Sequence, residues 1–302
     1  MAKVLISGGT GSIGLLMAEY LHDRGHEVGL LSRSERPNSR FQTYQWDPEE
    51  NTLDPEALDS CEYIIHLAGA GIADKAWTKE RKKEIIDSRV NSTDLLYNKV
   101  VELKPPLKAF ISASAVGYYG QVTSDRIFVE KNKAANDFVG KTCFLWEQAA
   151  ERFEDLGIRT VRLRIGIVLM KRGGALEKMA KPVQMGFGAI LGSGRQYIPW
   201  IHWKDLISLF DKAITDTRMS GAYNAVAPSF DTNAEFTKAL GRALGKRIWL
   251  PNAPGFILKA LLGERASLLL NGSRVSAEKV VSLGFEFEYS DIDAALQDLL
   301  GS

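Results

Sequence analysis

Residues 3–33 read KVLISGGTGSIGLLMAEYLHDRGHEVGLLSR, and this stretch decides the fold. A short apolar run is followed by glycines at positions 8, 11 and 14, then by a helical pattern that closes at Gly25, then by a second apolar run. A glycine pattern placed between a strand and a helix is typical of a dinucleotide-binding turn. Gly8 permits the tight turn, Gly11 lets backbone N–H groups approach a pyrophosphate, and Gly14 lets the helix pack closely on the strand. We therefore predict that the N-terminus of this helix faces the phosphates of a dinucleotide.

The end of the second apolar run indicates which dinucleotide is bound. A carboxylate at this place would bind the ribose 2′-hydroxyl of NAD, whereas an arginine accommodates the 2′-phosphate of NADP. The run ends in Ser32 and Arg33 instead of an acidic residue. We predict NADP(H) as the cofactor, with Arg33 as a solvated surface charge being the alternative.

The composition excludes several classes of partner. The 302 residues include 38 lysines and arginines and 37 aspartates and glutamates, so no overall field attracts nucleic acid or an anionic membrane. The apolar tract at residues 256–270 is interrupted by charges and is shorter than a membrane span, so two short amphipathic helices are expected there. The two cysteines, Cys61 and Cys143, lack the spacing of a metal site. No signal peptide precedes the first strand, so we expect a cytoplasmic location.

Apolar runs alternate with helical patterns along the first half of the chain. This alternation predicts an α/β fold with a Rossmann-type, doubly wound parallel sheet, whose ligand crevice lies at the carboxyl ends of the strands. Every crossover is expected to be helical. Strands are predicted at residues 4–7, 27–31, 43–45, 63–67, 109–112 and 160–168, and helices at residues 13–24, 79–103 and 137–156.

After residue 169 the alternation gives way to a glycine-rich region, KRGGAL and then MGFGAILGSGRQYIPW. We predict that a smaller, mostly helical substrate lobe is formed by residues 170–202 and 229–302. Residues 1–169 then form the NADP-binding domain, to which residues 203–228 return with a helix at 203–215 and a strand at 222–225. Further helices are expected at 233–244 and through 251–300, with a short strand at 285–289.

Five motifs together resemble the extended short-chain dehydrogenase/reductases of the nucleotide-sugar epimerase type. They are GGTGSIG at 8–14, HLAGA at 66–70, ISASAVGYYG at 111–120, RLRIGIVL at 162–169 and WIHWKDL at 200–206. With YNAVAP at 223–228 and the tail LLNGSRVSAEKVVSLGFEFEY, the chain resembles more narrowly the NADP-binding "epimerase family protein" branch. The resemblance implies a cofactor site formed by Gly8, Thr10, Gly11, Ser12, Ile13, Gly14, Ser32, Arg33, Leu67, Ala68 and Gly69. It also implies dimerisation through the helices at 79–103 and 137–156.

The resemblance implies a catalytic serine, but the proton-transfer pair of the family is absent. Family members use a serine to position the substrate oxygen, a tyrosine to move its proton and a lysine four residues later to lower the pKa of the tyrosine. Ser114 stands at the serine position. If Glu147 is aligned with the glutamate that follows the family lysine, Val139 stands at the tyrosine position and Cys143 at the lysine position. None of the nine tyrosines is followed four residues later by a lysine.

Replacement groups are therefore sought near the same loop. Tyr118, or its neighbour Tyr119, is a candidate proton donor, against the alternative that both pack. Arg89 stands where the family often has an asparagine, and it is either a fixed charge in the crevice or a surface arginine. His202 is expected to be a buried, hydrogen-bonded group, and Asp205 to cap a helix or anchor the two lobes. The loop carboxylates Asp125 and Glu130 are expected to be solvated.

Two hypotheses of function remain open. In the first, the protein is an NADP-dependent oxidoreductase or epimerase-like enzyme that acts on a small molecule through Ser114 and an unconventional proton donor such as Tyr118. In the second, the pocket binds NADP(H) and a further ligand, but the hydride chemistry has been lost. The second protein would be a regulatory or ligand-binding one.

Overall fold

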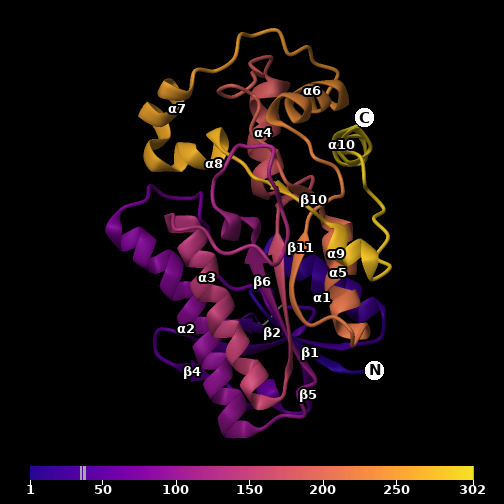
Figure 1. Ribbon diagram of the computed structural model, residues 1–302. Helices are drawn as coiled ribbons and strands as arrows, with labels where there is room; N and C mark the ends of the chain where they lie inside the picture. Colours follow the sequence, from indigo (N-terminus) through magenta and orange to yellow (C-terminus); the bar gives the residue numbers. More distant parts are fainter. Residues whose placement is uncertain (35, 37–38, 302) are drawn as a thin grey trace.

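An eight-stranded sheet forms the centre of the computed structural model, which describes residues 1–34, 36 and 39–301 (Figure 1). The strand order is β11-β8-β6-β5-β1-β2-β3-β4, and the pairs are parallel except for β3 with β4. The predicted Rossmann-type sheet is therefore confirmed. Its strands are β1 (Lys3–Ser7), β2 (Glu27–Ser32), β3 (Gln42–Asp47), β4 (Thr52–Leu53), β5 (Cys61–His66), β6 (Ala109–Ala115), β8 (Arg159–Ile165) and β11 (Gly221–Ala225).

Helices cover both faces of the sheet. Helices α1 (Ser12–Asp23) and α5 (Trp203–Thr215) pack on one face, and α2 (Lys79–Leu103) and α3 (Phe138–Glu151) on the other (Figure 1). Successive strand residues point to opposite faces. Accordingly, Val4 and Ile6 of β1 belong to the core beneath α1 and α5, whereas Leu5 belongs to the core beneath α2 and α3.

The long helix α2 has the predicted bounds because both of its ends carry specific signals. The Thr78 side chain accepts a hydrogen bond from the backbone N–H of Arg81 and so caps the first turn. Lys104 adopts a left-handed conformation with φ of 48°, and two prolines follow it. Proline cannot continue a helix, so the chain turns here toward β6.

A second group of elements has its own apolar core and lies above the sheet in Figure 1. This core includes Leu176, Trp200, Phe236 and Leu296, all buried. The elements that contribute to it are β9 (Ile167–Leu169), α4 (Gly174–Gln184), β10 (Trp200–His202), α6 (Asn233–Ala243) and α10 (Ile292–Leu300). Helices α7 (Gly255–Leu262) and α8 (Ser267–Leu270) lie at the same end of the molecule (Figure 1), whereas α9 (Glu278–Ser282) packs with Val280 on the core beneath α1 and α5. The smaller, mostly helical lobe is thus present, while its exact sequence limits stay a prediction.

Three sequence predictions about local structure were wrong. The strand expected at 160–168 divides at Gly166, whose N–H donates to the Ala225 carbonyl, so β8 ends and β9 pairs with β10 instead. Residues 285–289 form no strand. In the described part of the loop between β2 and β3 there is no helix, and β4 is antiparallel. The glycine-rich region contains helix α4, for which no individual helix was predicted.

The end of the chain is tied back to the large sheet domain. Strand β12 (Arg274–Val275) pairs in parallel with β7 (Ile127–Phe128), and the amide of Asn224 on β11 donates to the Ser276 carbonyl at 2.9 Å. The Asp205 carboxylate at the start of α5 accepts from the backbone N–H groups of Glu288 and Tyr289. Asp205 therefore anchors the C-terminal tail to the start of α5. Of its two predicted roles, this agrees with the anchoring role. Among the helices described, none combines the length and apolarity that crossing a membrane requires.

Candidate functional site

The glycine turn between β1 and α1 has the geometry that the sequence predicts. Gly8 has φ of +70°, and a Cβ there would lie 2.9 Å from the backbone N of Ala68. A Cβ on Gly14 would lie 2.4 Å from the Gly8 carbonyl oxygen, so α1 packs against the turn at a distance that only glycine permits. A Cβ on Gly11 would meet only that same oxygen, at 3.3 Å. Gly11 thus faces open space where the other two face protein.

The N-terminus of α1 offers unpaired backbone donors at this turn. Gly11 is the residue that precedes the helix, it provides no side-chain cap, and the first turn carries no acidic residue. Thr10, Ser12 and Ile13 are exposed or half-buried around it. The first N–H groups of a helix lack intrahelical partners and carry partial positive charge, so they favour an anion. These residues fit the phosphates of a dinucleotide.

Residues that follow β5 and β2, the two strands beside β1, complete this end of the crevice. The Leu67 N–H donates to the Ser7 carbonyl at 3.0 Å, which holds the segment of Leu67, Ala68 and Gly69 against the glycine turn. At the end of β2, the Ser32 hydroxyl donates to the Ser34 carbonyl and Arg33 is exposed. The structure therefore gathers all eleven residues predicted for the cofactor at the carboxyl ends of β1, β2 and β5. Their binding role remains a prediction.

Ser114, at the carboxyl end of β6, lies in a buried ionic network. Its hydroxyl donates to the Glu147 carboxylate at 2.7 Å, and Glu147 is also held by Nε and Nη2 of Arg164, each at 2.8 Å. All three side chains are buried. Burial lowers the pKa of Arg164, but hydrogen bonds to Glu147 and the charge of that carboxylate outweigh the burial and raise it. A serine hydroxyl has one proton, so Ser114 in this arrangement can accept a hydrogen bond from a ligand but cannot donate one.

The two tyrosines after Ser114 also contact Arg164. Arg164 Nη1 donates to the Tyr119 hydroxyl at 2.9 Å, and that hydroxyl donates to Asn224 Oδ1 at 2.6 Å. Burial raises the pKa of Tyr119 to about 12. The ring of Tyr118 lies 3.5 Å from the Arg164 guanidinium, and burial raises the pKa of Tyr118 as well. Tyr119 thus has a packing and hydrogen-bonding role, whereas Tyr118 remains half-buried at the loop.

The sequence contained a pattern that indicates a buried ion pair here, although it does not identify the partner of each arginine. In RLRIGIVL, Arg162 and Arg164 occur at alternate positions of an otherwise apolar central strand, and a charge in such a strand needs a buried partner. Glu130, expected to be solvated, instead accepts the N–H of Asn224 at 2.8 Å; that expectation was wrong. Asp125 is exposed as expected.

Helix α3 presents Val139 and Cys143 at the positions of the missing tyrosine and lysine. Both side chains are buried. Burial raises the pKa of the Cys143 thiol to about 12, so this group is neutral at physiological pH. Neither side chain can transfer a proton in the manner of a tyrosine and lysine pair.

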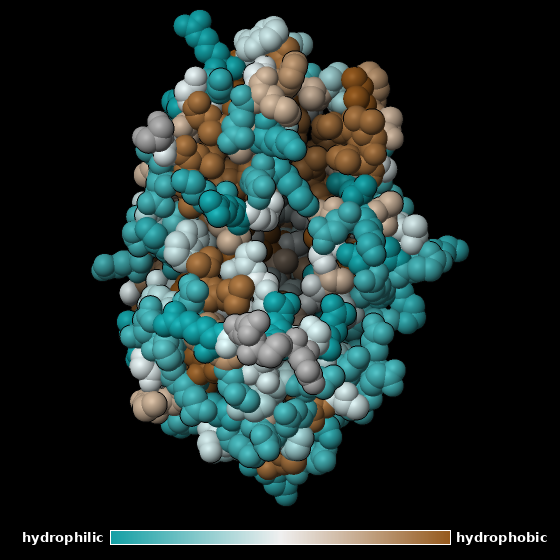
Figure 2. Space-filling view, turned by 180° about the vertical axis from the view of Figure 1, so that it is seen from behind, coloured by the Kyte–Doolittle hydropathy of each residue, from teal (hydrophilic) through white to brown (hydrophobic). Residues whose placement is uncertain are grey.

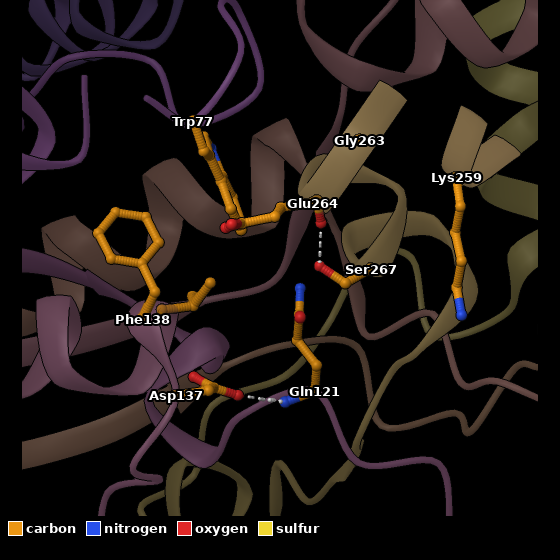
Figure 3. A pocket seen from close by; sticks show the side chains of 9 residues that line it. Trp77, Gln121, Asp137, Phe138, Lys259, Gly263, Glu264 and Ser267 are labelled. Carbon is orange, nitrogen blue, oxygen red and sulfur yellow. Dashed lines mark hydrogen bonds between the residues drawn. The ribbon is translucent and has the colours of Figure 1, made fainter. Parts of the chain in front are cut away.

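Val139 also lines a cavity of about 470 Å³ between the sheet domain and the smaller lobe (Figure 3). One wall is formed by the N-terminus of α3 and by the loop before α2, and the other by α7 and α8 with the turn between them. Figure 2, from the opposite side, shows the molecule hollowed between its upper and lower parts, with apolar residues beside the hollow. The cavity is lined by Trp77, Gln121, Asp137, Phe138, Val139, Lys259, Gly263, Glu264 and Ser267.

Most polar groups around the cavity are already occupied. Asp137 accepts the backbone N–H groups of Gly140 and Gln121, and Glu264 pairs with Lys82 on α2. The rings of Trp77 and Phe138 meet edge to face with centroids 5.0 Å apart. Gln121 Nε2 is buried and has no partner among the described residues. A compact ligand with an apolar part and a hydrogen-bond acceptor fits these walls. Sequence reasoning missed this cavity because its walls come from segments more than 100 residues apart.

His202 is fully buried and stacks on the Tyr289 ring at 3.8 Å. Its Nδ1 accepts the Lys204 N–H, so His202 caps α5 in place of Asp205. Burial lowers the pKa of His202 to about 4. The expectation of a buried, hydrogen-bonded histidine is confirmed. Within the residues described, no group of three or more His, Cys, Asp or Glu side chains is placed to bind a metal ion.

Two family models match the chain. One, described as the NAD dependent epimerase/dehydratase family, matches residues 4–226, and the other, a domain of unknown function (DUF1731), matches residues 253–299. Among curated proteins, "Epimerase family protein SDR39U1" of Mus musculus is 36% identical over 302 residues and covers 99% of each chain. "Epimerase family protein YfhF" of Bacillus subtilis is 35% identical over 301 residues, covering 99% of this chain and 98% of its own.

Solved structures agree with these matches. Human epimerase family protein SDR39U1 (isoform 2), crystallised with NADPH, superposes with a TM-score of 0.90 at 34% identity and 99% coverage of both chains. UDP-N-acetylglucosamine 4-epimerase from Bacillus cereus superposes with a TM-score of 0.80 at 19% identity, over 99% of this chain and 98% of its own. At that identity the second likeness concerns the fold alone.

Proposed function

The chain belongs to the NAD-dependent epimerase/dehydratase family, and on that premise we propose that it binds NADP(H) in the crevice at the carboxyl ends of β1, β2 and β5. The observation that carries this proposal is the glycine turn, where Gly8 and Gly14 are enclosed by backbone while Gly11 faces open space. The uncapped N-terminus of α1 supports it. The NADPH in the similar human protein supports it as well.

Each part of the cofactor has matching residues in this chain. The backbone from Thr10 to Ile13 would hold the pyrophosphate, and Arg33, exposed after Ser32, would hold the 2′-phosphate. Leu67, Ala68 and Gly69 would border the nicotinamide half. When bound, NADPH supplies a hydride, and the protein's own residues bind and orient the reacting molecules.

We propose further that the protein is an oxidoreductase or epimerase-like enzyme whose small-molecule substrate occupies the cavity beside Val139. Trp77 and Phe138 would contact an apolar part of the substrate, and Gln121 Nε2, which has no partner in the described structure, would donate to a substrate oxygen. Ser114 and Tyr118 remain the proposed catalytic residues. Because Ser114 donates to Glu147, its contribution would be as an acceptor, and Tyr118 would be the proton donor.

A second candidate function is supported by a specific observation. Val139 and Cys143 occupy the two proton-transfer positions, and the Ser114 proton is already engaged. With Val139 and Cys143 aligned to those positions, this arrangement favours a protein that binds NADP(H) and a further ligand without hydride transfer. Such a protein would be regulatory.

One pair of measurements separates the two functions. NADPH fluorescence is titrated with protein, and then oxidation of bound NADPH is followed at its absorbance band against a panel of aldehydes, ketones and quinones. Saturable binding with oxidation that is lost in Tyr118→Phe supports the enzyme. Binding without oxidation by any class, unchanged in Ser114→Ala, supports the regulatory protein. A protein that prefers NADH would contradict the role of Arg33.

The resemblance also implies a homodimer, for which α2 and α3 would form the interface. Val101 and Leu103 on α2 and Phe144 and Leu145 on α3 are exposed apolar side chains. Light scattering after size exclusion should give twice the mass of 33.4 kDa. Phe144→Glu should return the protein to a monomer, and an unchanged mass in that variant would contradict this interface. The cytoplasmic location stays a prediction.

A further inference from the structure

We propose that Arg89 of α2 binds the nicotinamide half of the cofactor, donating hydrogen bonds to its phosphate or ribose oxygens. The inference rests on the proposed binding of NADP(H) and adds a residue that lies outside the predicted cofactor set. The observation behind it is that the Arg89 guanidinium has no carboxylate partner among the residues described.

Arg89 is a partly buried cation that lacks a carboxylate. In the part of the chain that the structure describes, no Asp or Glu oxygen pairs with its guanidinium, and only the Ala70 and Ile85 carbonyls accept from it. Both of those hydrogen bonds come from Nη1, at 3.1 and 2.8 Å. The N–H groups on Nε and Nη2 have no hydrogen-bond acceptor among the described residues.

The most deeply buried arginines of the same domain have carboxylate partners. Arg81, Arg162 and Arg164 are the buried arginines, and each pairs with a glutamate: Glu84, Glu151 and Glu147 respectively. Desolvating a charge without such a partner is costly, so it is retained where a ligand supplies the partner. The Cys143 thiol near Arg89 is neutral and cannot serve as that partner.

The guanidinium lies at the place where the nicotinamide half would pass. A Cβ added to Gly69 would lie 3.1 Å from Cζ and 3.3 Å from Nε of Arg89, so the group touches the segment after β5. Strand β1, with the glycine turn, lies between β5 and β2. A dinucleotide whose 2′-phosphate meets Arg33 beyond β2 and whose pyrophosphate meets the turn after β1 reaches Gly69 with its other half.

The surroundings hold Arg89 in this position. Its guanidinium lies 4.9 Å from the Trp146 ring centroid on α3, a favourable cation–π distance. The Ala70 N–H is held in turn by the Ser88 hydroxyl at 2.9 Å. The cation is therefore fixed between α2, α3 and the segment after β5, with a planar fork of donors suited to phosphate or ribose oxygens.

The test compares two ligands that differ in the half concerned. NADPH contains both halves, whereas adenosine 2′,5′-bisphosphate retains the 2′-phosphate end alone. Their dissociation constants are measured by fluorescence titration and calorimetry for wild type, Arg89→Met, Arg89→Lys and, as a control, Lys79→Met, which removes an exposed cation of the same helix. The melting temperature of each variant is measured without ligand.

We expect Arg89→Met to weaken NADPH binding at least about tenfold while binding of adenosine 2′,5′-bisphosphate changes less than about twofold. Arg89→Lys should recover part of the loss, and Lys79→Met should bind both ligands as wild type does. The unliganded melting temperature of Arg89→Met should not fall, because an unpaired charge is removed.

Two results would overturn the inference. The first is an unchanged affinity of Arg89→Met for NADPH. The second is an equal loss of affinity for both ligands together with a lower melting temperature. That result would show that Arg89 only supports the fold. If wild type bound neither ligand, the proposed cofactor itself would be refuted.

Discussion

The two ends of the crevice differ in what their polar groups are bonded to. At the β1–α1 end, backbone N–H groups point outward from a turn of glycines and no side chain caps them. At the β6–α3 end, Ser114, Glu147 and Arg164 are buried and hydrogen-bonded to one another. The first end therefore has backbone donors free for an anion, whereas the polar side chains of the second end are partnered within the protein. The β1–α1 end therefore keeps the geometry of a dinucleotide site. The β6–α3 end has lost the tyrosine and lysine pair of the family.

The largest expected effect tests the self-contained end. Glu147→Leu removes the carboxylate and leaves Arg164 buried without its partner, which should lower the free energy of unfolding by about 3–5 kcal/mol. Urea denaturation followed by circular dichroism measures it. The control is Asp293→Asn, which breaks the exposed pair with Arg242 and should cost less than about 1 kcal/mol. Similar losses in the two variants would contradict the central role of this network.

The next effect tests the open end with two glycines of the same turn. Gly11→Val should weaken NADPH binding more than about 100-fold with little change in stability, since a side chain there meets open space needed by the ligand. Gly14→Ala should lose binding and also about 1–3 kcal/mol of stability, because its Cβ meets the Gly8 carbonyl. NADPH titration and thermal unfolding are measured on both. If Gly11→Val binds NADPH normally, the glycine turn is not the phosphate site.

His66, the last residue of β5, gives the stability of the protein a pH dependence. Its ring contacts the Ser7 and Thr93 hydroxyls at 2.6 and 3.1 Å, and burial lowers its pKa from 6.5 to about 3. The unfolded histidine takes up its proton near pH 6.5 while the folded one does not, so lowering the pH favours unfolding. This contribution to stability is complete above pH 6.5 and is lost progressively as the pH falls toward 3. At pH 5 the loss is about 2 kcal/mol.

Urea denaturation at pH 7 and pH 5 checks this, with His66→Gln as the comparison. The variant should lose about 2 kcal/mol less stability than wild type between these pH values. Parallel profiles for the two proteins would show that His66 does not carry the dependence.

The smallest expected effect concerns Arg33, which follows β2 at the β1–α1 end of the crevice. Arg33 is exposed, so its charge is screened, and Arg33→Ala should weaken NADPH about five- to tenfold while leaving NADH unchanged. Competition titrations with the two cofactors measure the ratio. Equal weakening of both would place Arg33 away from the 2′-phosphate.

The binding end could be predicted from sequence because its determinants are local. A strand, a turn and a helix within 33 residues fix the glycine geometry, and the long helix α2 ends where its capping residue and prolines dictate. The other end depends on contacts between distant segments. Glu147 with Arg164 and Asn224 with Glu130 have no local pattern that pairs them, and the cavity is lined by residues as distant as Gln121 and Ser267. The predicted strand divides at Gly166 because β8 pairs with β11 and β9 pairs with β10. Periodicity along one segment does not show which strands it pairs with.

The two-residue strand β12 has a consequence for how the chain reaches its native state. Residues 274–289 supply a strand beside β7, the acceptor for the Asn224 amide and the N–H groups that Asp205 binds. During synthesis these residues follow the whole sheet, so Asn224 Nδ2 and the Asp205 carboxylate lack these partners until the tail has been made. Because long-range contacts form slowly, we expect this closure to be a late step of folding, and we expect a chain that stops before residue 274 to be less stable and more readily degraded.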